Sequence, residues 1–107
     1  MKSIEFHGHS LETIRKFPLV VTREIGYQLD RLQRGLNPVD WKPMPTVGKG
    51  VREMRIHRHG QYRVIFVTNV ADSILVLHAF KKKAAKTARV DINQARNALK
   101  RATKRRE

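Results

Sequence analysis

The first 35 residues show a weak strand pattern followed by two helical patterns. Ile4–Gly8 alternates between apolar and polar positions and predicts a short first strand. Ser10 offers an N-cap for a short helix, which is expected to stop before Pro18. A second helix follows, and Gly35 stands where a left-handed C-cap would end it. Its apolar stripe, at helical spacing, is formed by Val21, Ile25, Leu29 and Leu32.

Residues 36–50 contain three prolines and two glycines and predict a long loop, in which we expect Trp41 to pack over a sheet edge. Three strand patterns then follow, at Val51–Arg58, Tyr62–Asn69 and Ser73–Phe80. The second and third are apolar on both faces and rich in β-branched and aromatic residues, which is typical of central strands. Val70–Ser73 fits a tight turn between them.

The last part of the chain predicts a basic helix over about residues 87–104. Thr87 is a candidate N-cap, and Asp91 lies in the first turns, where negative charge suits the helix dipole. The apolar stripe is narrow, so we expect this helix to dock lightly. The stripe consists of Ile92, Ala95, Leu99 and Ala102.

The register of the hairpin over residues 51–69 decides which side chains share a face, because a one-residue slip moves every side chain to the other face. A two-residue turn at His59–Gly60 would mix charged and apolar residues on both faces. A three-residue loop at His59–Gln61, with Gly60 in a left-handed conformation, pairs Arg58 with Tyr62 and separates them. One face then collects Met54, Ile56, Tyr62, Val64 and Phe66. The other collects Glu53, Arg55, His57 and Arg63, with Ile65 and Val67.

The apolar face is expected to pack on the two N-terminal helices, and the charged face to present its side chains on rigid strands. Guanidinium groups match phosphate oxygens, so the arginines could bind a phosphodiester and offset charge during phosphoryl transfer. Glu53 could act as a general base or orient an arginine, and His57 or His78 could transfer protons. Alternatively, Glu53 forms cross-strand ion pairs with Arg55 or Arg63 on a face that is merely solvated. The residues by themselves leave both alternatives open.

The charge of the chain favours a polyanionic partner. Lys and Arg number 23 against 9 Asp and Glu, which gives a formal net charge of +14. Residues 81–107 carry a net +9 of this total. An excess on this scale indicates nucleic acid binding more often than a basic surface without a partner.

Other kinds of site are weakly supported. The chain has no cysteine, which excludes disulfides and cysteine metal sites and fits a reducing cytoplasm. Two His-x-His pairs, His7 with His9 and His57 with His59, lack supporting carboxylate spacing, so we expect no metal and no other cofactor. No apolar run approaches the ~20 residues of a membrane span, and the N-terminus lacks a signal-peptide core.

Three quoted segments resemble the phage-derived branch of the RelE/HigB toxin superfamily: "VGKGVREMRI", "YRVIFV" and "ILVLHAFKKKAAKTARVDINQAR". The similarity consists of a Gly-x-Gly-Val start, an acidic residue before a strand Arg, and "YR" opening the next strand. A final pattern is carried by Leu77, His78, Phe80, Lys82, Lys83, Lys86 and Thr87. Ala84 and Ala88 depart from it, standing where Thr and Pro are usual, and the missing Pro should loosen the helix start slightly.

The resemblance implies a single α+β domain over residues 1–107, with two N-terminal helices on a small, mainly antiparallel sheet and a C-terminal helix. It implies the toxin half of a type II toxin–antitoxin pair. Such toxins are metal-independent endoribonucleases that cut mRNA, generally in the ribosomal A site. The ribose 2′-OH attacks the adjacent phosphate and leaves a 2′,3′-cyclic phosphate.

The resemblance also implies roles for individual residues on the basic face of the sheet. Arg63 matches the arginine that contacts the scissile phosphate. Glu53 and Arg55 match an acid/base position and a further phosphate contact. The end of the last strand matches positions for proton transfer, base stacking and leaving-group stabilisation, namely His78, Phe80, Lys82 and Lys83. Lys81, Lys86 and His57 are further candidates for RNA binding.

The implied partners are mRNA, the ribosome and a cognate antitoxin of the helix-turn-helix type, all in the cytoplasm and without a membrane. A non-catalytic, basic, nucleic-acid-binding phage-related protein is the alternative. It would keep the basic face but lose activity, and the sequence does not separate the two.

Overall fold

The computed structural model describes residues 1–104, apart from the side chain of Asn69. Five strands form one sheet in the order β1-β5-β4-β3-β2, in which β1 and β5 are parallel and the other neighbours antiparallel. In chain order the elements are β1 (Ser3–Phe6), α1 (Ser10–Arg15), α2 (Leu19–Gln33), β2 (Trp41–Pro43), β3 (Arg52–His57), β4 (Gln61–Val70), β5 (Ser73–Lys81) and α3 (Arg89–Lys104). The expected α+β class, with a mainly antiparallel sheet, is confirmed.

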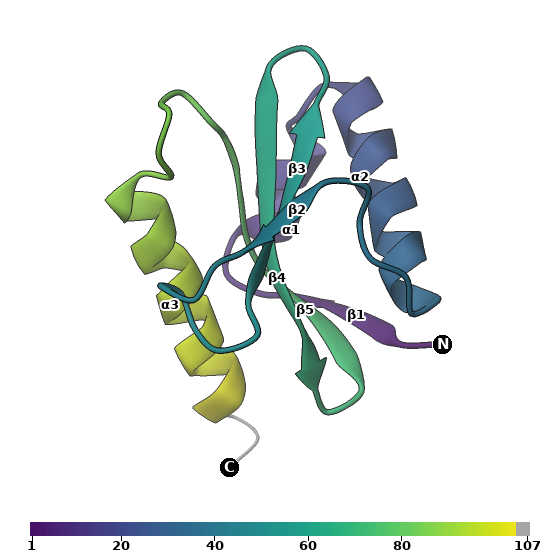
Figure 1. The fold of residues 1–107 in the computed structure, drawn as a ribbon, viewed down its shortest axis with the longest axis vertical. Coiled ribbons are helices and arrows are strands. Elements are labelled where there is room, and N and C mark those ends of the chain that lie inside the picture. Colours follow the sequence, from purple (N-terminus) through teal and green to yellow (C-terminus); the bar gives the residue numbers. More distant parts are fainter. Residues whose placement is uncertain (105–107) are drawn as a thin grey trace.

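The sheet lies between two helical layers, with α2 on one side and α3 on the other (Figure 1). Residues of α1 and α2, such as Ile14 and Ile25, share a core with Met54, Val64 and Phe66 of the sheet. Three alanines of α3 join a second core on the opposite face, with Ile65, Val67, Leu75 and Leu77. The predicted packing of the N-terminal helices on the apolar face is therefore confirmed.

The two N-terminal helices differ in how well their ends follow the sequence signals. Gly35 has φ +81, and the N–H of Leu36 donates to the carbonyl of Arg31 at 2.9 Å, so the predicted C-cap of α2 is confirmed. The prediction that Ser10 caps α1 is wrong, because Ser10 lies inside the first turn. Its hydroxyl donates to the carbonyl of His7 at 2.8 Å, and thereby ties α1 to the strand that precedes it.

The predicted loop of residues 36–50 contains a short strand that the sequence pattern did not reveal. β2 pairs with β3 at the edge of the sheet, a position that tolerates Pro43 because the N–H that proline lacks is not needed there. Trp41 packs at this edge, as predicted, and the Arg52 guanidinium lies 5.0 Å from the centroid of its ring. The strand matters for the site, because it brings two further charged residues beside β3.

The β3–β4 hairpin has a three-residue loop, as predicted, but at Arg58–Gly60 rather than at His59–Gln61. His57 pairs with Gln61 and Arg55 with Arg63, so the register differs by two residues from the prediction. His59 and Gly60 both take positive φ, at 54° and 117°. A shift of two residues keeps every side chain on its predicted face, because the strand period is two. The predicted separation of the two faces is confirmed.

The β4–β5 hairpin has a two-residue turn, Ala71–Asp72, with φ values of 49° and 58°. Positive φ at both central residues is what a type I′ turn requires, so the predicted tight turn is confirmed. Two register shifts interrupt this pair, one between Ile65 and Phe66 and one between Val67 and Val70. They allow Leu77 and its neighbour His78 to face α3 together, since Leu77 lies in the core under α3 and His78 bonds to that helix.

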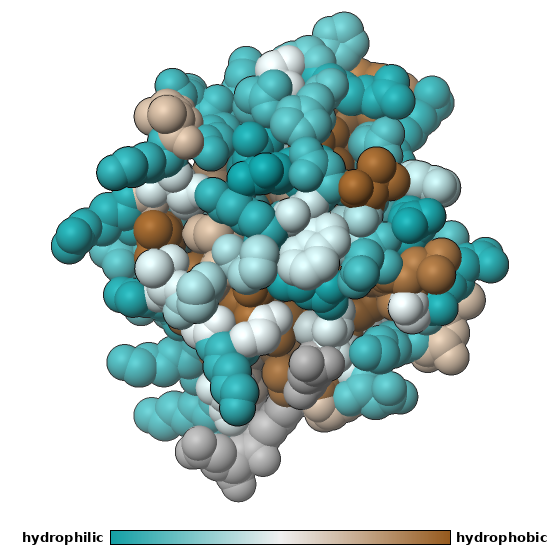
Figure 2. Space-filling view, viewed as in Figure 1, coloured by the Kyte–Doolittle hydropathy of each residue, from teal (hydrophilic) through white to brown (hydrophobic). Residues whose placement is uncertain are grey.

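The C-terminal helix begins at Arg89, and the hydroxyl of Thr87 donates to Glu53 instead of capping the helix. The helix docks more closely than the narrow stripe predicted, because Ala95, Ala98 and Ala102 are buried and let the backbone approach the sheet. Hydrophilic side chains cover most of the face seen in Figure 2, and apolar ones appear in separate small areas. Within residues 1–104 no helix combines the length and the apolar character that crossing a bilayer needs.

Candidate functional site

The charged face of the sheet can be described as three rows of side chains that cross the strands. The pairing places Arg55 beside Arg63 and Arg63 beside Phe80, and Asp40 extends this row through the bond from the Arg55 N–H to its carbonyl. The row toward α3 runs through Lys42, Glu53, Ile65 and His78. The row toward the hairpin loop runs through His57, Gln61 and Lys82. Residues from four strands thus share one face within about 5 Å of their neighbours.

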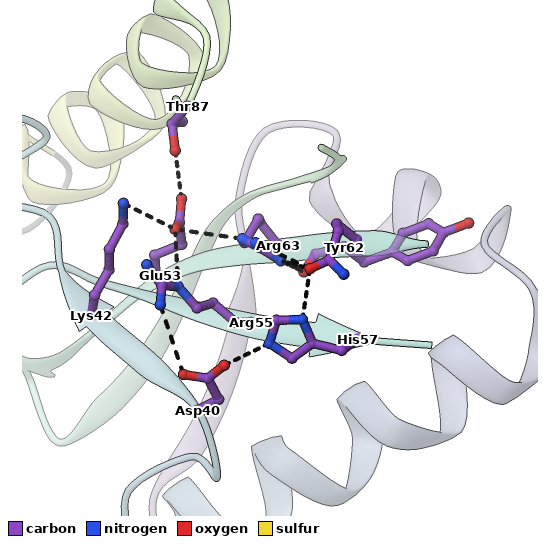
Figure 3. A network of polar contacts seen from close by, with 9 residues as sticks. Asp40, Lys42, Glu53, Arg55, His57, Tyr62, Arg63 and Thr87 are labelled. Carbon is purple, nitrogen blue, oxygen red and sulfur yellow. Dashed lines mark hydrogen bonds and ion pairs between the residues drawn. The ribbon is translucent and has the colours of Figure 1, made fainter. Parts of the chain in front are cut away.

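At the centre of this face lies the carboxylate of Glu53, which has no exposed surface. Its Oε1 is 3.6 Å from Nε of Arg63, 3.9 Å from Nε of Arg55 and 3.8 Å from Nζ of Lys42 (Figure 3). Its Oε2 accepts a hydrogen bond of 2.9 Å from the hydroxyl of Thr87. We call Lys42, Glu53, Arg55 and Arg63 the cation cluster. Three positive charges surround one carboxylate, so the cluster can still attract an anion.

The ion pairs of the cation cluster are longer than hydrogen bonds. Among the described residues, Glu53 Oε1 and the Nε atoms of Arg55 and Arg63 are buried without a hydrogen-bond partner. Buried polar atoms without partners are uncommon in proteins and are often completed by a ligand. A tetrahedral anion that approached the two guanidinium groups would supply acceptors for these N–H groups.

Arg63 is nearly buried, with 5% of its surface exposed, and its guanidinium is held in place. Its Nη atoms donate to Oε1 of Gln61 at 3.3 Å and to the carbonyl of Tyr62 at 2.9 Å. Burial lowers the pKa of Arg63, while the carboxylate of Glu53 opposes this shift. Burial also lowers the pKa of Lys82, and the positive charge of Arg63 lowers it further. The mutual influence places Lys82 in the field of the cation cluster.

His57 lies at the open end of the face, between two acceptors. Its Nε2 is 2.6 Å from Oδ2 of Asp40, and its Nδ1 is 2.6 Å from Oε1 of Gln61. Oδ1 of Asp40 is also 3.9 Å from Arg55. Gln61 thus connects His57 with Arg63, and about half of the His57 side chain remains exposed. A solvent-accessible imidazole with a fixed orientation can exchange protons with a bound molecule.

His78 is held on the side of the face that α3 covers. Its Nε2 lies 2.8 Å from Oδ1 of Asp91 in α3, and its ring stacks on Phe80 with centroids 5.5 Å apart. Both members of the His78–Asp91 pair are 19% exposed at the side chain. Ile65 separates His78 from Glu53 in the row across the strands. His78 therefore borders the cation cluster without contacting it.

The lysines that follow β5 divide between the two faces. Lys82, Lys83 and Lys86 line a pocket of about 240 Å³ together with Phe80 and Asp91. Lys81 lies on the opposite face, where its Nζ is 5.8 Å from the ring centroid of Tyr62. The structure thus brings together nine of the ten candidate residues on one face and at its border, and leaves Lys81 apart.

Four residues of the site were missed by the sequence analysis: Asp40, Lys42, Gln61 and Thr87. Asp40 and Lys42 flank Trp41 with the period of two that marks one face of a strand, but the surrounding prolines concealed this short pattern. Gln61 was assigned to the hairpin loop, and Thr87 was assigned to the helix cap. Each error concerned a boundary of an element, where sequence patterns are weakest.

The histidines do not gather into a metal site. In the part of the chain that is described, no group of three His, Asp or Glu side chains could hold a metal ion. His7 lies 3.1 Å from Glu5, and His9 lies 3.5 Å from Glu12, each as a separate pair. The cations of the cluster are the groups that this face offers to an anion.

A five-stranded sheet between helical layers, with a basic cluster on one face, defines a small α+β domain consistent with the RelE-like fold. Residues 12–100 match the family described as phage derived protein Gp49-like (DUF891). The match covers most of the chain, so the chain belongs to this Gp49-like family, which is a family of RelE-like toxins. No curated protein matches the chain.

Proposed function

We propose that this protein is the toxin of a type II toxin–antitoxin system, of the HigB-like branch, and that it is an endoribonuclease that cleaves mRNA. The observation that carries the proposal is the cation cluster, in which three positive side chains surround one buried carboxylate on an otherwise open part of the sheet. Family membership supports the toxin, and the geometry of the cluster supports a phosphodiester as its ligand.

In the proposed reaction, the guanidinium groups of Arg63 and Arg55 bind the non-bridging oxygens of the scissile phosphate. The ribose 2′-oxygen attacks the phosphorus and loses its proton, the bond to the 5′-oxygen breaks, and that oxygen gains a proton. The products are a 2′,3′-cyclic phosphate and a free 5′-hydroxyl. Charge that develops on the phosphate is offset by the arginines and Lys82, so the reaction needs no metal ion.

His57 is our candidate for the proton transfer, and Glu53 for orienting the arginines. The exposed ring of His57 faces two acceptors, Asp40 and Gln61, so the doubly protonated ring would donate through both nitrogens and could protonate the leaving oxygen. Glu53 is buried and close to three cations, which suits an orienting role better than exchange with substrate. His78, paired with Asp91, would support Phe80 as the surface on which a base stacks.

The surroundings of the cation cluster are suited to an RNA strand. Lys82, Lys83 and Lys86 line the pocket beside Phe80, and they would bind the phosphates next to the cleavage point. The basic outer surface of α3 would contact ribosomal RNA in the cytoplasm. An antitoxin that covers the basic face should associate quickly at low salt and more slowly as salt is added, because charge attraction would steer the encounter.

The proposal is tested by mapping 5′ ends of cellular mRNA after induction, with and without active ribosomes. We expect growth arrest and new 5′-hydroxyl ends from the wild type, and neither from Arg63→Ala. Arg23→Ala, which removes an exposed arginine of α2, is the matched control and should remain toxic. His57→Ala should lose activity and His9→Ala should keep it. With purified components, cleavage should continue in EDTA and stop when the attacking ribose is 2′-deoxy.

Two outcomes would contradict the proposal. If Arg63→Ala folds and remains as toxic as the wild type, the cation cluster does not carry the activity. If the wild type binds RNA but leaves no new ends under any condition, the protein is the non-catalytic nucleic-acid-binding alternative.

A further inference from the structure

The segment between β5 and α3, residues 82–88, is fixed to the sheet at both ends. At its start, the N–H of Lys82 donates to the carbonyl of Gln61 at 2.7 Å. Near its end, the hydroxyl of Thr87 donates to Oε2 of Glu53 at 2.9 Å. We call these residues the lysine segment, because they include Lys82, Lys83 and Lys86. The second anchor is a single hydrogen bond from a side chain that is part-exposed to one that is fully buried.

Thr87 was expected to cap α3, but the hydrogen bonds at the start of the helix exclude that role. The N–H groups of Asp91 and Ile92 donate to the carbonyl of Ala88 at 3.0 and 3.1 Å. The hydroxyl of Thr87 points instead toward the carboxylate of Glu53, across a separation of 34 residues in the sequence (Figure 3). A change at Thr87 therefore acts on Glu53 and on the lysine segment rather than on a helix cap.

We propose that Thr87 is a positioning residue, whose hydroxyl fixes the Glu53 carboxylate and thereby holds the lysine segment over the cation cluster. With Oε2 bound to the hydroxyl, Oε1 stays 3.6 Å from Nε of Arg63, too far for a hydrogen bond. Without the hydroxyl, a buried oxygen would lack its donor, and the carboxylate would turn toward the guanidinium groups. Arg63 would then be occupied by Glu53 and would be less available to a phosphate.

The proposal has one consequence that is independent of any activity and one that rests on the proposed ribonuclease function. The first is that the lysine segment opens more often when the hydroxyl is removed. The second is that RNA cleavage falls, because Arg63 binds Glu53 and the lysines lose their places. The two can be measured separately, so failure of one is distinguishable from failure of the other.

The first measurement is limited digestion of the whole folded protein with trypsin, with cleavage after Lys83 and Lys86 followed by mass spectrometry. Thr87→Val is expected to speed cleavage there by about tenfold, as expected for loss of a hydrogen bond to a charged group. Thr87→Ser, which keeps the hydroxyl, should stay close to the wild type. Thr103→Val is the matched control, since the hydroxyl of Thr103 donates within α3 to the carbonyl of Leu99 at 2.9 Å.

A second background shows whether Thr87 acts through Glu53. Glu53→Leu removes the acceptor and keeps much of the volume. In that background, Thr87→Val should produce no further increase in trypsin cleavage, because the bond is already absent. An unchanged tenfold increase there would mean that Thr87 holds the segment by another contact, and would overturn the proposal.

The second measurement compares cleavage of an RNA oligonucleotide with binding of its 2′-deoxy analogue. Thr87→Val should lower kcat by about tenfold, with a smaller change in KM, because the lost bond weakens transition-state stabilisation more than ground-state binding. Thr87→Ser should restore kcat. A variant that was merely less stable would show neither this division nor this rescue.

The outcomes separate cleanly. Equal trypsin cleavage of Thr87→Val and wild type would overturn the positioning role, whatever the RNA result. Faster cleavage together with lower kcat, both rescued by Thr87→Ser, would support it. Faster cleavage in a protein whose wild type never cuts RNA would support the anchor and overturn the proposed function.

Discussion

The two faces of the sheet are made by alternate residues of the same strands, yet they differ in kind. On the face under α1 and α2, Met54, Val64 and Phe66 have no exposed surface and contact only a closed apolar core. On the face under α3, an apolar half that includes Ile65 gives way to a charged half that includes Glu53 and Arg63. One face is used entirely for stability, and the other is divided between stability and chemistry.

The difference teaches that strand parity and burial are separate questions. Parity assigns Glu53 to the charged face, but its carboxylate is as completely buried as Phe66 on the other face. It is buried because β2 supplies Lys42 and the lysine segment supplies Thr87, neither of which belongs to the hairpin. The covering elements, rather than the strands, decide which charged side chains lose contact with water.

The largest effect that would sharpen this comparison is expected on the apolar face. Phe66→Ala removes a ring with no exposed surface from the core shared with α1 and α2, and should lower the free energy of unfolding by about 3–5 kcal/mol. Denaturant unfolding followed by circular dichroism would measure it. Leu19→Ala, at an exposed position of α2, should cost less than about 0.5 kcal/mol. Similar losses at both positions would contradict the assignment of the core.

A smaller loss is expected from the centre of the charged face. Glu53→Gln keeps the shape but leaves Lys42, Arg55 and Arg63 without their shared counter-charge. Breaking a fully buried pair costs about 3–5 kcal/mol, and because Lys42 and Arg55 are partly solvated we expect about 1–3 kcal/mol here. The loss should shrink in 1 M salt, which screens repulsion among the cations. A loss that is independent of salt would mean that packing, not charge, holds Glu53.

The architecture could be predicted because its strongest signals are periodic. The spacing from Val21 to Leu32 defined α2, and hydrophobic runs defined β4 and β5. The hairpin was predicted with the wrong register but the right faces, since an error of two residues preserves parity. β2 could not be predicted, because three residues beside prolines form a strand only when β3 is already in place.

The candidate site was predicted in part for the same reason. Arg55, His57 and Arg63 follow from parity within one hairpin. Asp40 and Thr87 join them only through contacts across 17 and 34 residues of sequence, with His57 and Glu53 respectively, and no local pattern encodes such contacts. Lys81 was grouped with its neighbours by sequence proximity, but strand alternation turns it to the other face, over Tyr62.

A change at Gln61 should separate stability from binding on the charged face. Gln61 Oε1 accepts from Arg63 and lies 2.6 Å from His57 Nδ1, so Gln61→Glu would place a negative charge among donors. The free energy of unfolding should rise by about 0.5–1 kcal/mol, since hydrogen bonds to a charged acceptor are stronger. Affinity for RNA should fall, because the new carboxylate competes with phosphate for Arg63. Gln94→Glu, at an exposed position of α3, is the control. A variant that gained stability without losing affinity would show that phosphate does not bind at Arg63.

The smallest effect concerns Lys82, whose pKa is lowered by burial and by the charge of Arg63. Because the folded-state pKa lies below the unfolded value of 10.5, the charged ammonium opposes folding at neutral pH. This penalty disappears as the pH rises through the folded pKa toward 10.5, so Lys82 makes the free energy of unfolding increase with pH in that alkaline range. Lys82→Met should therefore gain a few tenths of a kcal/mol at pH 7 and lose this part of the slope.

The difference between Lys82→Met and wild type is the quantity to measure, by denaturant unfolding at several pH values between 7 and 10.5, because other lysines and tyrosines titrate in both proteins. Lys83→Met, at an exposed position one residue on, is the matched control and should show little change in slope. The apolar face offers no counterpart, since its buried side chains do not titrate. If the two lysine variants had the same pH dependence, Lys82 would lie outside the field of the cation cluster, and the charged half of the face would end at Arg63.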